Sequence, residues 1–170
     1  MDALVSGALD LGFVHYTPAH AERDLVTVPM AEESLAAVVS EQHRFASRRQ
    51  VALHELADED FILPSSDASD SLHDNIIAAC VRAGFQPRVV QEASDFRLLL
   101  GLVSADMGVA LVSSVSRGIR IRGIHYLSIA PRHIIRLAAM YRDGPAGRAI
   151  APYLPRIADV TPFGESTLEL

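Results

Sequence analysis

The chain has a single cysteine in 170 residues and lacks any apolar run approaching the 18 residues that a membrane helix needs. One cysteine excludes an internal disulfide, and Cys80 lies at an apolar position of a predicted helix, which favours a small buried residue over a reactive thiol. The first segment, MDALVSGALDLGFVH, has an acid at position two and no basic stretch before an apolar core. We therefore predict a cytoplasmic protein with no signal peptide and no membrane span.

Positive charge is also scarce, since the net charge is −6 and the pI is about 5.6. Binding to a phosphate backbone normally needs a basic surface that releases counterions. This chain by itself is therefore not expected to hold nucleic acid. Its 49% hydrophobic and 21% charged residues are typical of a globular chain long enough to bury a core.

Catalytic and cofactor motifs are missing as well. The sequence contains no GxSxG, HExxH, P-loop or GxGxxG pattern, and its seven histidines show no metal-ligand spacing. Asp67, Asp70 and His73 are close in sequence, but such a group at a helix start is more often a charged capping region than a metal site. We predict neither an enzyme nor a bound metal or cofactor.

Apolar strand-like runs alternate with helical patterns along the chain, which predicts an α/β fold with a largely parallel sheet. The expected strands are 9–14, 25–29, 35–39, 61–63, 88–91, 109–112, 125–129 and 134–141. The acidic pair Glu32 and Glu33 separates the second strand from the third. Helices are expected at 53–57, at 71–83, after a cap at Ser94 or Asp95, and near the end of the chain, where Pro152 and Pro155 should kink or shorten the last one.

The most informative segment follows the strand 61–63. Pro64 ends that strand, and several Ser and Asp residues then lead into the helix 71–83. Such a helix directs free N–H groups and its positive dipole end at whatever lies above the strand, and Ser hydroxyls there can donate to a carboxylate or phosphate. On the local sequence alone, capping and turn formation are favoured over ligand contact as the role of the same residues. His15 ends the first strand, where ligands meet open α/β sheets, although a structural histidine fits its position too.

Four segments in order carry a resemblance that covers about residues 3–158. They are SGALDLGF at 6–13, HELADEDFIL at 54–63, AGFQPRVVQEASD at 83–95 and GLVSADMGVALVS at 101–113. Each is common alone, but the combination and spacing resemble the effector-binding domain of LysR-type transcriptional regulators.

That resemblance implies two Rossmann-like subdomains of the type 2 periplasmic-binding-protein fold, with a small effector bound in the cleft between them. It assigns residues 1–62 and 131–160 to an incomplete first lobe, 63–130 to the second lobe and 161–170 to a tail. The cleft-facing positions that it implies are His15, Tyr16, Ser65, Ser66, Ser69, Asp70, Ser71 and Ser113.

The family also has an N-terminal winged helix-turn-helix and an opening strand, helix and strand, and none of these has a counterpart here. We therefore expect a truncated form whose uncovered sheet face and edge promote association. The expected partners are a small anionic effector and further copies of the chain, as a dimer or tetramer, with DNA reached only through the missing domain. The alternative is a stand-alone solute-binding protein of the same fold.

Overall fold

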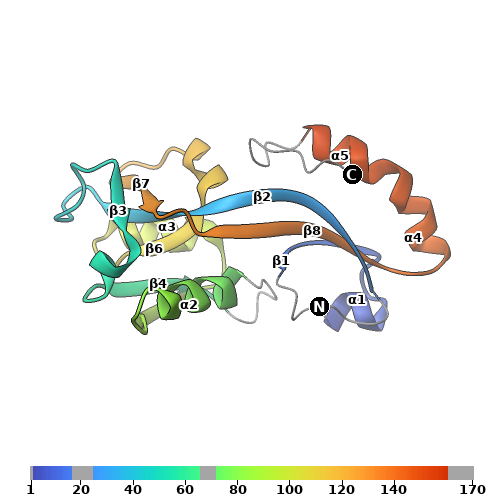
Figure 1. The fold of residues 1–170 in the computed structure, drawn as a ribbon, viewed down its shortest axis with the longest axis horizontal. Coiled ribbons are helices and arrows are strands. Elements are labelled where there is room, and N and C mark those ends of the chain that lie inside the picture. The colour runs from blue at the N-terminus through green and yellow to red at the C-terminus, as the bar shows by residue number, and fades with distance from the viewer. Residues whose placement is uncertain (1, 17–24, 66–71, 161–170) are drawn as a thin grey trace. The chain divides into compact units, whose positions relative to one another are not determined.

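The computed structural model describes residues 2–16, 25–65 and 72–160. Figure 1 shows the elements in chain order: α1 (Asp2–Ser6), β1 (Leu11–Tyr16), β2 (Leu25–Ser40), β3 (Gln50–Ala52), the 3-10 helix η2 (Leu53–Leu56), β4 (Asp60–Pro64), α2 (Leu72–Arg82), β5 (Arg88–Ala93), α3 (Phe96–Ser104), β6 (Ala110–Ser113), the 3-10 helix η4 (Ser114–Gly118), β7 (Ile124–Ala130), β8 (Ile134–Arg142), α4 (Pro145–Ile150), the 3-10 helix η5 (Ala151–Tyr153) and α5 (Leu154–Val160). None of the helices in these ranges is long and apolar enough to cross a membrane.

The chain divides into two compact units. Unit 1 comprises residues 1–33 and 135–170, and unit 2 comprises residues 34–134. This division differs from the predicted lobes, which change at residues 62–63 and 130–131. Residues 35–40 belong with unit 2 because they pair with β6 and β7. The predicted lobe boundaries remain a prediction.

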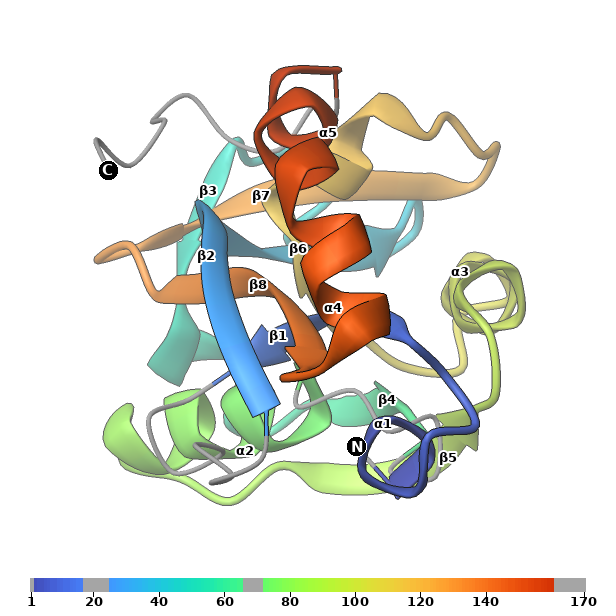
Figure 2. The same ribbon diagram turned by 90° about the vertical axis from the view of Figure 1, so that its right-hand side faces the viewer.

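Unit 1 is built on β1, β8 and the first part of β2. β1 and β8 pair antiparallel, with Leu11 opposite Tyr141 and Tyr16 opposite Arg136. The helices α4 and α5 lie along these strands (Figure 2), and their apolar side chains pack against a buried cluster. The buried members of that cluster are Met30, Ala31, Leu137, Ala139, Tyr141 and Leu154.

The strand β2 corrects one prediction. The acidic pair Glu32 and Glu33 does not separate two strands, because β2 runs unbroken for 16 residues through it. Both carboxylates have partners in unit 1: Arg136 Nε lies 2.9 Å from Glu32 Oε1, and His15 Nε2 lies 3.2 Å from Glu33 Oε2. A carboxylate that is paired can be buried within a sheet, whereas burial of an unpaired carboxylate costs free energy and favours an exposed turn instead.

Unit 2 corrects another prediction, that of a largely parallel sheet. β2 pairs antiparallel with β6 and with β7, and only β3 joins β7 in parallel. The prediction of a parallel sheet was wrong because residues 35–39 are all buried. Their continuous apolar run is the pattern usual for parallel strands that are covered on both faces. β4 and β5 do pair in parallel and form a separate two-stranded sheet.

The helices agree better with the sequence. α2 spans Leu72–Arg82 against the predicted 71–83, and Asp95 caps α3 as one of the two predicted caps. The last helix is interrupted, as its prolines predict, because η5 separates α4 from α5. α3 packs its buried face, with Leu99, Leu100 and Val103, against Ala36, Val38 and Val112 of the unit 2 sheet.

Candidate functional site

His15 is the predicted ligand residue that the structure describes most fully. It lies near the end of β1, with 14% of its side chain exposed, and its Nε2 is 3.2 Å from Oε2 of Glu33, a carboxylate that is 2% exposed. A carboxylate only accepts hydrogen bonds, so Nε2 carries the hydrogen in this pair. The other ring nitrogen, Nδ1, is buried and has no hydrogen-bond partner in the part of the chain that the structure describes.

The orphaned nitrogen gives His15 two possible roles toward a ligand. In the neutral ring Nδ1 is an acceptor, and in the protonated ring it becomes a second donor. A buried polar atom without a partner costs free energy, and a ligand group that reaches it would recover that cost.

A second histidine in unit 2 makes a useful comparison. His43 Nε2 lies 3.3 Å from Glu59 Oε2, and its Nδ1 accepts a hydrogen bond from the Phe45 N–H at 3.2 Å. Its ring also packs 5.4 Å from the Phe45 ring. His43 Nε2 is, like His15 Nδ1, a buried ring nitrogen without a hydrogen-bond partner among the described residues, but it lies within ion-pair distance of Glu59. No carboxylate of the described residues lies at that distance from His15 Nδ1.

Tyr16, the last residue of β1, stands opposite Arg136 in the register. The structure therefore places both first-lobe candidates at one end of β1. Sequence reasoning missed Glu33. Its signal was an acid within an otherwise apolar strand, which is expected to be paired when it is buried.

The second-lobe candidates lie in unit 2. Ser65 follows β4 and its N–H donates to the Ala93 carbonyl at 2.9 Å. Ser113 ends β6, is 7% exposed, and its Oγ accepts from the Val115 N–H at 3.3 Å, which caps η4. The other candidates, Ser66, Ser69, Asp70 and Ser71, lie outside the described residues.

A further pair of serines adjoins Ser113. Leu35 and Ser113 are opposite each other in the register of β2 and β6, and the neighbouring hydroxyls of Ser34 and Ser114 are 3.1 Å apart. The dipeptide Ser113-Ser114 at a strand end was visible in the sequence, but the approach of Ser34 depends on the strand register. The result is a small group of hydroxyls at the β6 end of unit 2.

The remaining chemistry of the described residues is modest. They hold no group of three or more His, Cys, Asp or Glu side chains that could bind a metal ion. His73 lies against Asp74, the next residue, at 3.2 Å. Burial, followed by the nearby Arg82 guanidinium, lowers the pKa of His133, and burial raises the pKa of Tyr126. Tyr126 Oη donates to the Ile119 carbonyl at 3.0 Å.

The chain consists of two α/β units, and polar side chains lie at the ends of strands in both. This combination is typical of ligand-binding domains. Residues 1–152 match the model of the LysR substrate binding domain, and the chain belongs to that family. This confirms the resemblance read from the sequence.

Among curated proteins, the chain is similar to the HTH-type transcriptional regulator AlsR of Bacillus subtilis (strain 168). The two are 31% identical over 116 residues, which cover 68% of this chain and 38% of AlsR. A second relative, the regulator CatR of Pseudomonas putida, is 30% identical over 132 residues, covering 76% of this chain and 44% of CatR. The chain thus spans about two fifths of the length of these relatives.

Solved structures confirm the fold class. The effector-binding domain of QuiR in complex with shikimate has a TM-score of 0.78 at 23% identity, covering 93% of this chain and 76% of that one. The BenM effector-binding domain with its effector benzoate has a TM-score of 0.76 at 21% identity, covering 99% and 79%. This chain is accordingly an effector-binding domain of the LysR type, with the type 2 periplasmic-binding-protein fold.

Proposed function

We propose that the domain binds a small anionic effector, most simply a carboxylate, through His15 and Tyr16 of unit 1 and the serines 65, 66, 69, 71 and 113 with Asp70 of unit 2. The observation that carries this proposal is the His15–Glu33 pair, in which the buried Nδ1 of His15 has no hydrogen-bond partner among the described residues. When its ring is protonated, His15 presents a donor at Nδ1, which suits a carboxylate oxygen. The shikimate and benzoate of the QuiR and BenM structures, both carboxylates, support the same ligand class.

Binding without catalysis is the whole proposed mechanism. The effector acts by its differential affinity for two arrangements of an oligomeric regulator in the cytoplasm, which shifts their populations. DNA binding then belongs to a winged helix-turn-helix elsewhere in the full-length regulator. The acidic net charge of −6 supports this division of labour, because the effector domain itself does not attract DNA.

The test is a thermal-shift screen of the chain, and of the full-length regulator, against small carboxylates that include shikimate and benzoate. A ligand at one hundred times its Kd should stabilise the folded state by about 2.7 kcal/mol and so raise Tm. His15→Ala and Ser66→Ala should abolish the shift for any hit, and Glu33→Gln should weaken it. His43→Gln is the matched control and should leave it unchanged.

No shift with either protein across the panel would contradict the proposal. So would a hit whose Tm shift survives both His15→Ala and Ser66→Ala. Retained binding in the His43→Gln variant is needed to show that loss at His15 is local and does not reflect a general loss of stability.

A further inference from the structure

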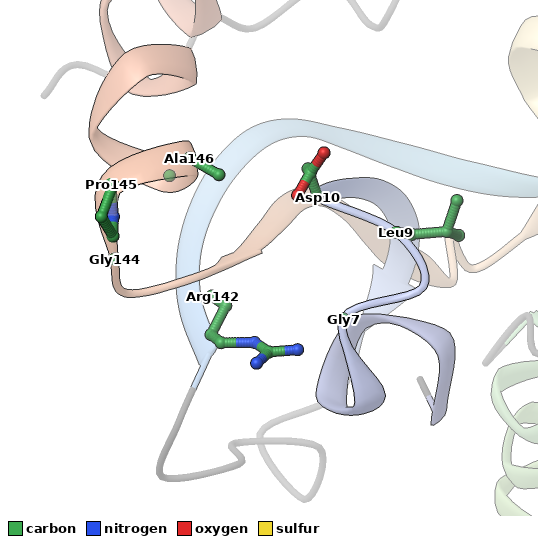
Figure 3. Close-up of a pocket in the computed structure, with 8 residues that line it drawn as sticks. Gly7, Leu9, Asp10, Arg142, Gly144, Pro145 and Ala146 are labelled. Carbon is green, nitrogen blue, oxygen red and sulfur yellow. The ribbon is translucent and has the colours of Figure 1, made fainter.

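A pocket of about 230 Å³ lies in unit 1, at the end of β1 opposite to His15. It opens between two turns, the one that joins α1 to β1 and the one that joins β8 to α4 (Figure 3). Asp10 and His15 are five residues apart along the strand, roughly 16 Å at about 3.3 Å per residue. The pocket is therefore separate from the effector residues proposed above. Liquid water takes roughly 30 Å³ per molecule, so the pocket has room for a small organic molecule.

Glycine keeps this pocket open. Gly7 has a positive φ of 79°, and a Cβ at this position would lie only 2.3 Å from a terminal nitrogen of Arg142. Gly144 and Gly147 line the other side, together with Pro145 and Ala146. The Arg142 guanidinium consequently extends beside the Gly7 backbone and into the space between the two turns (Figure 3).

Arg142 is only partly used by the fold. One terminal nitrogen donates to the Leu4 carbonyl at 3.2 Å, which leaves most of its five N–H donors without an acceptor among the described residues. No carboxylate of the described residues lies within ion-pair distance of it. The adjacent Asp143 faces Arg148 instead, at 3.8 Å.

Asp10 provides the opposite charge in the same pocket. It lines the pocket across the gap from Arg142 (Figure 3), and the ion pairs of the described residues include none between these two side chains. No described residue forms a hydrogen bond or ion pair with its carboxylate. The pocket therefore holds an exposed cation and an exposed anion that are held apart and form no ion pair with each other.

We propose that this pocket binds a zwitterion, an α-amino acid with a small side chain. Arg142 takes the carboxylate through its planar fork of N–H groups, and Asp10 accepts from the ammonium group. A ligand with only one of the two charges would pair with only one of these two side chains. The site is independent of the effector residues at the far end of β1.

The test uses glycine and alanine as probes, with acetate and methylammonium as the two half-ligands. Binding is followed by NMR through the amide signals of Gly7 and Gly147 and the Nε–H signal of Arg142. Titration to about 50 mM covers the millimolar Kd values expected for weak small-ligand binding. Both amino acids should shift these signals, and acetate and methylammonium should each bind at least about tenfold more weakly.

Variants separate the pocket from its surroundings. Asp10→Asn removes a charge that forms no hydrogen bond or ion pair with a described residue, and it should weaken glycine binding at least about tenfold without changing stability. Arg142→Gln and Gly7→Ala should abolish binding, the latter by displacing the guanidinium. Arg148→Gln, on α4 but outside the pocket lining, and His15→Ala should both leave glycine binding unchanged.

Three results would each overturn the proposal: no shift of the three signals with glycine or alanine, acetate binding as tightly as glycine, or full glycine binding in Asp10→Asn. If glycine does not bind to this pocket, the proposed binding of a carboxylate at His15 is unaffected. The thermal-shift screen tests residues at the other end of β1.

Discussion

Cys80 shows how burial at a single position controls chemistry. It lies on α2 with no exposed surface, as the apolar sequence position predicts, and burial raises the pKa of its thiol to about 11 from a usual 9.0. Little thiolate is therefore present at neutral pH, and only the thiolate reacts as a nucleophile. The chain has no other cysteine, so any thiol signal reports this residue.

We expect native protein at pH 8 to react with a disulfide reagent far more slowly than protein unfolded in guanidinium. The sign of the pH dependence follows from the raised pKa, because the unfolded thiol ionises before the folded one. The contribution of Cys80 to stability is complete below pH 9 and is lost as pH rises from about 9 to about 11. Equally fast labelling of native and unfolded protein would show that the thiol is accessible.

Two glycines predict different costs for the same substitution. At Gly108 a Cβ would lie 2.7 Å from the Asp60 carbonyl oxygen. The same oxygen accepts a hydrogen bond from the Val109 N–H at 2.7 Å, and this bond joins β4 to the residue before β6. At Gly84 the space is open and only the φ of 94° is unfavourable for a side chain.

Gly108→Ala should therefore lower the free energy of unfolding by about 3 kcal/mol through the backbone clash. Gly84→Ala, the matched control, should cost only about 1 kcal/mol because it adds left-handed strain alone. Urea unfolding of the two variants measures both values. Equal losses would mean that the approach of the two strands is not what Gly108 protects.

Among the elements, α3 depends on one capping residue. Asp95 Oδ1 accepts from the N–H groups of Arg97 at 2.9 Å and Leu98 at 3.0 Å. Asp95→Ala should cost about 1 kcal/mol of unfolding free energy, because these N–H groups lose their acceptor. Asp95→Asn keeps an acceptor and should lose much less. Denaturant unfolding distinguishes the two, and matched losses would argue that the charge matters and the cap does not.

The elements also show where sequence reasoning succeeds. Local signals located α3, the interrupted last helix and the short strands around Phe61 and Val89, because caps, prolines and apolar runs act over a few residues. Strand direction and the continuity of β2 were wrong, since both depend on partners far along the chain, such as Arg136 for Glu32.

The same division applies to the candidate site. His15 was predicted from its place at a strand end. Glu33 was missed because its contact with His15 joins two strands through residues 18 positions apart in the sequence. Ser34 was missed for the same reason, since its contact with Ser114 spans 80 residues. The choice between capping and ligand contact for the serines before α2 stays open, since four of the five positions from Ser65 to Ser71 named as ligands lie outside the described residues.

For the molecule as a whole, the exposed apolar side chains of unit 1 bear on the predicted association. β1 is the last strand at its end of the six-stranded sheet, and Val5, Leu9 and Phe13 nearby are 43%, 53% and 40% exposed. Edge strands with exposed apolar residues favour contact between copies, and a lysine on the edge opposes it.

Phe13→Lys should therefore shift the chain toward monomer, as measured by sedimentation over a range of concentrations. Ile119→Lys, at a residue of unit 2 that is 47% exposed, is the control and should leave the association unchanged. A wild-type chain that stays monomeric at the highest concentration would remove the basis for this prediction.

The order of the two units along the chain governs how the protein is completed during synthesis. Unit 2 is one continuous segment, residues 34–134, whereas β1 must wait for β8, its partner from Leu11 opposite Tyr141. Chains grow from the N-terminus at roughly 5–20 residues per second, so β1 remains unpaired with β8 for several seconds at least while unit 2 is made. Unit 2 can therefore fold first. Unit 1 can complete its sheet only after β8 has been synthesised.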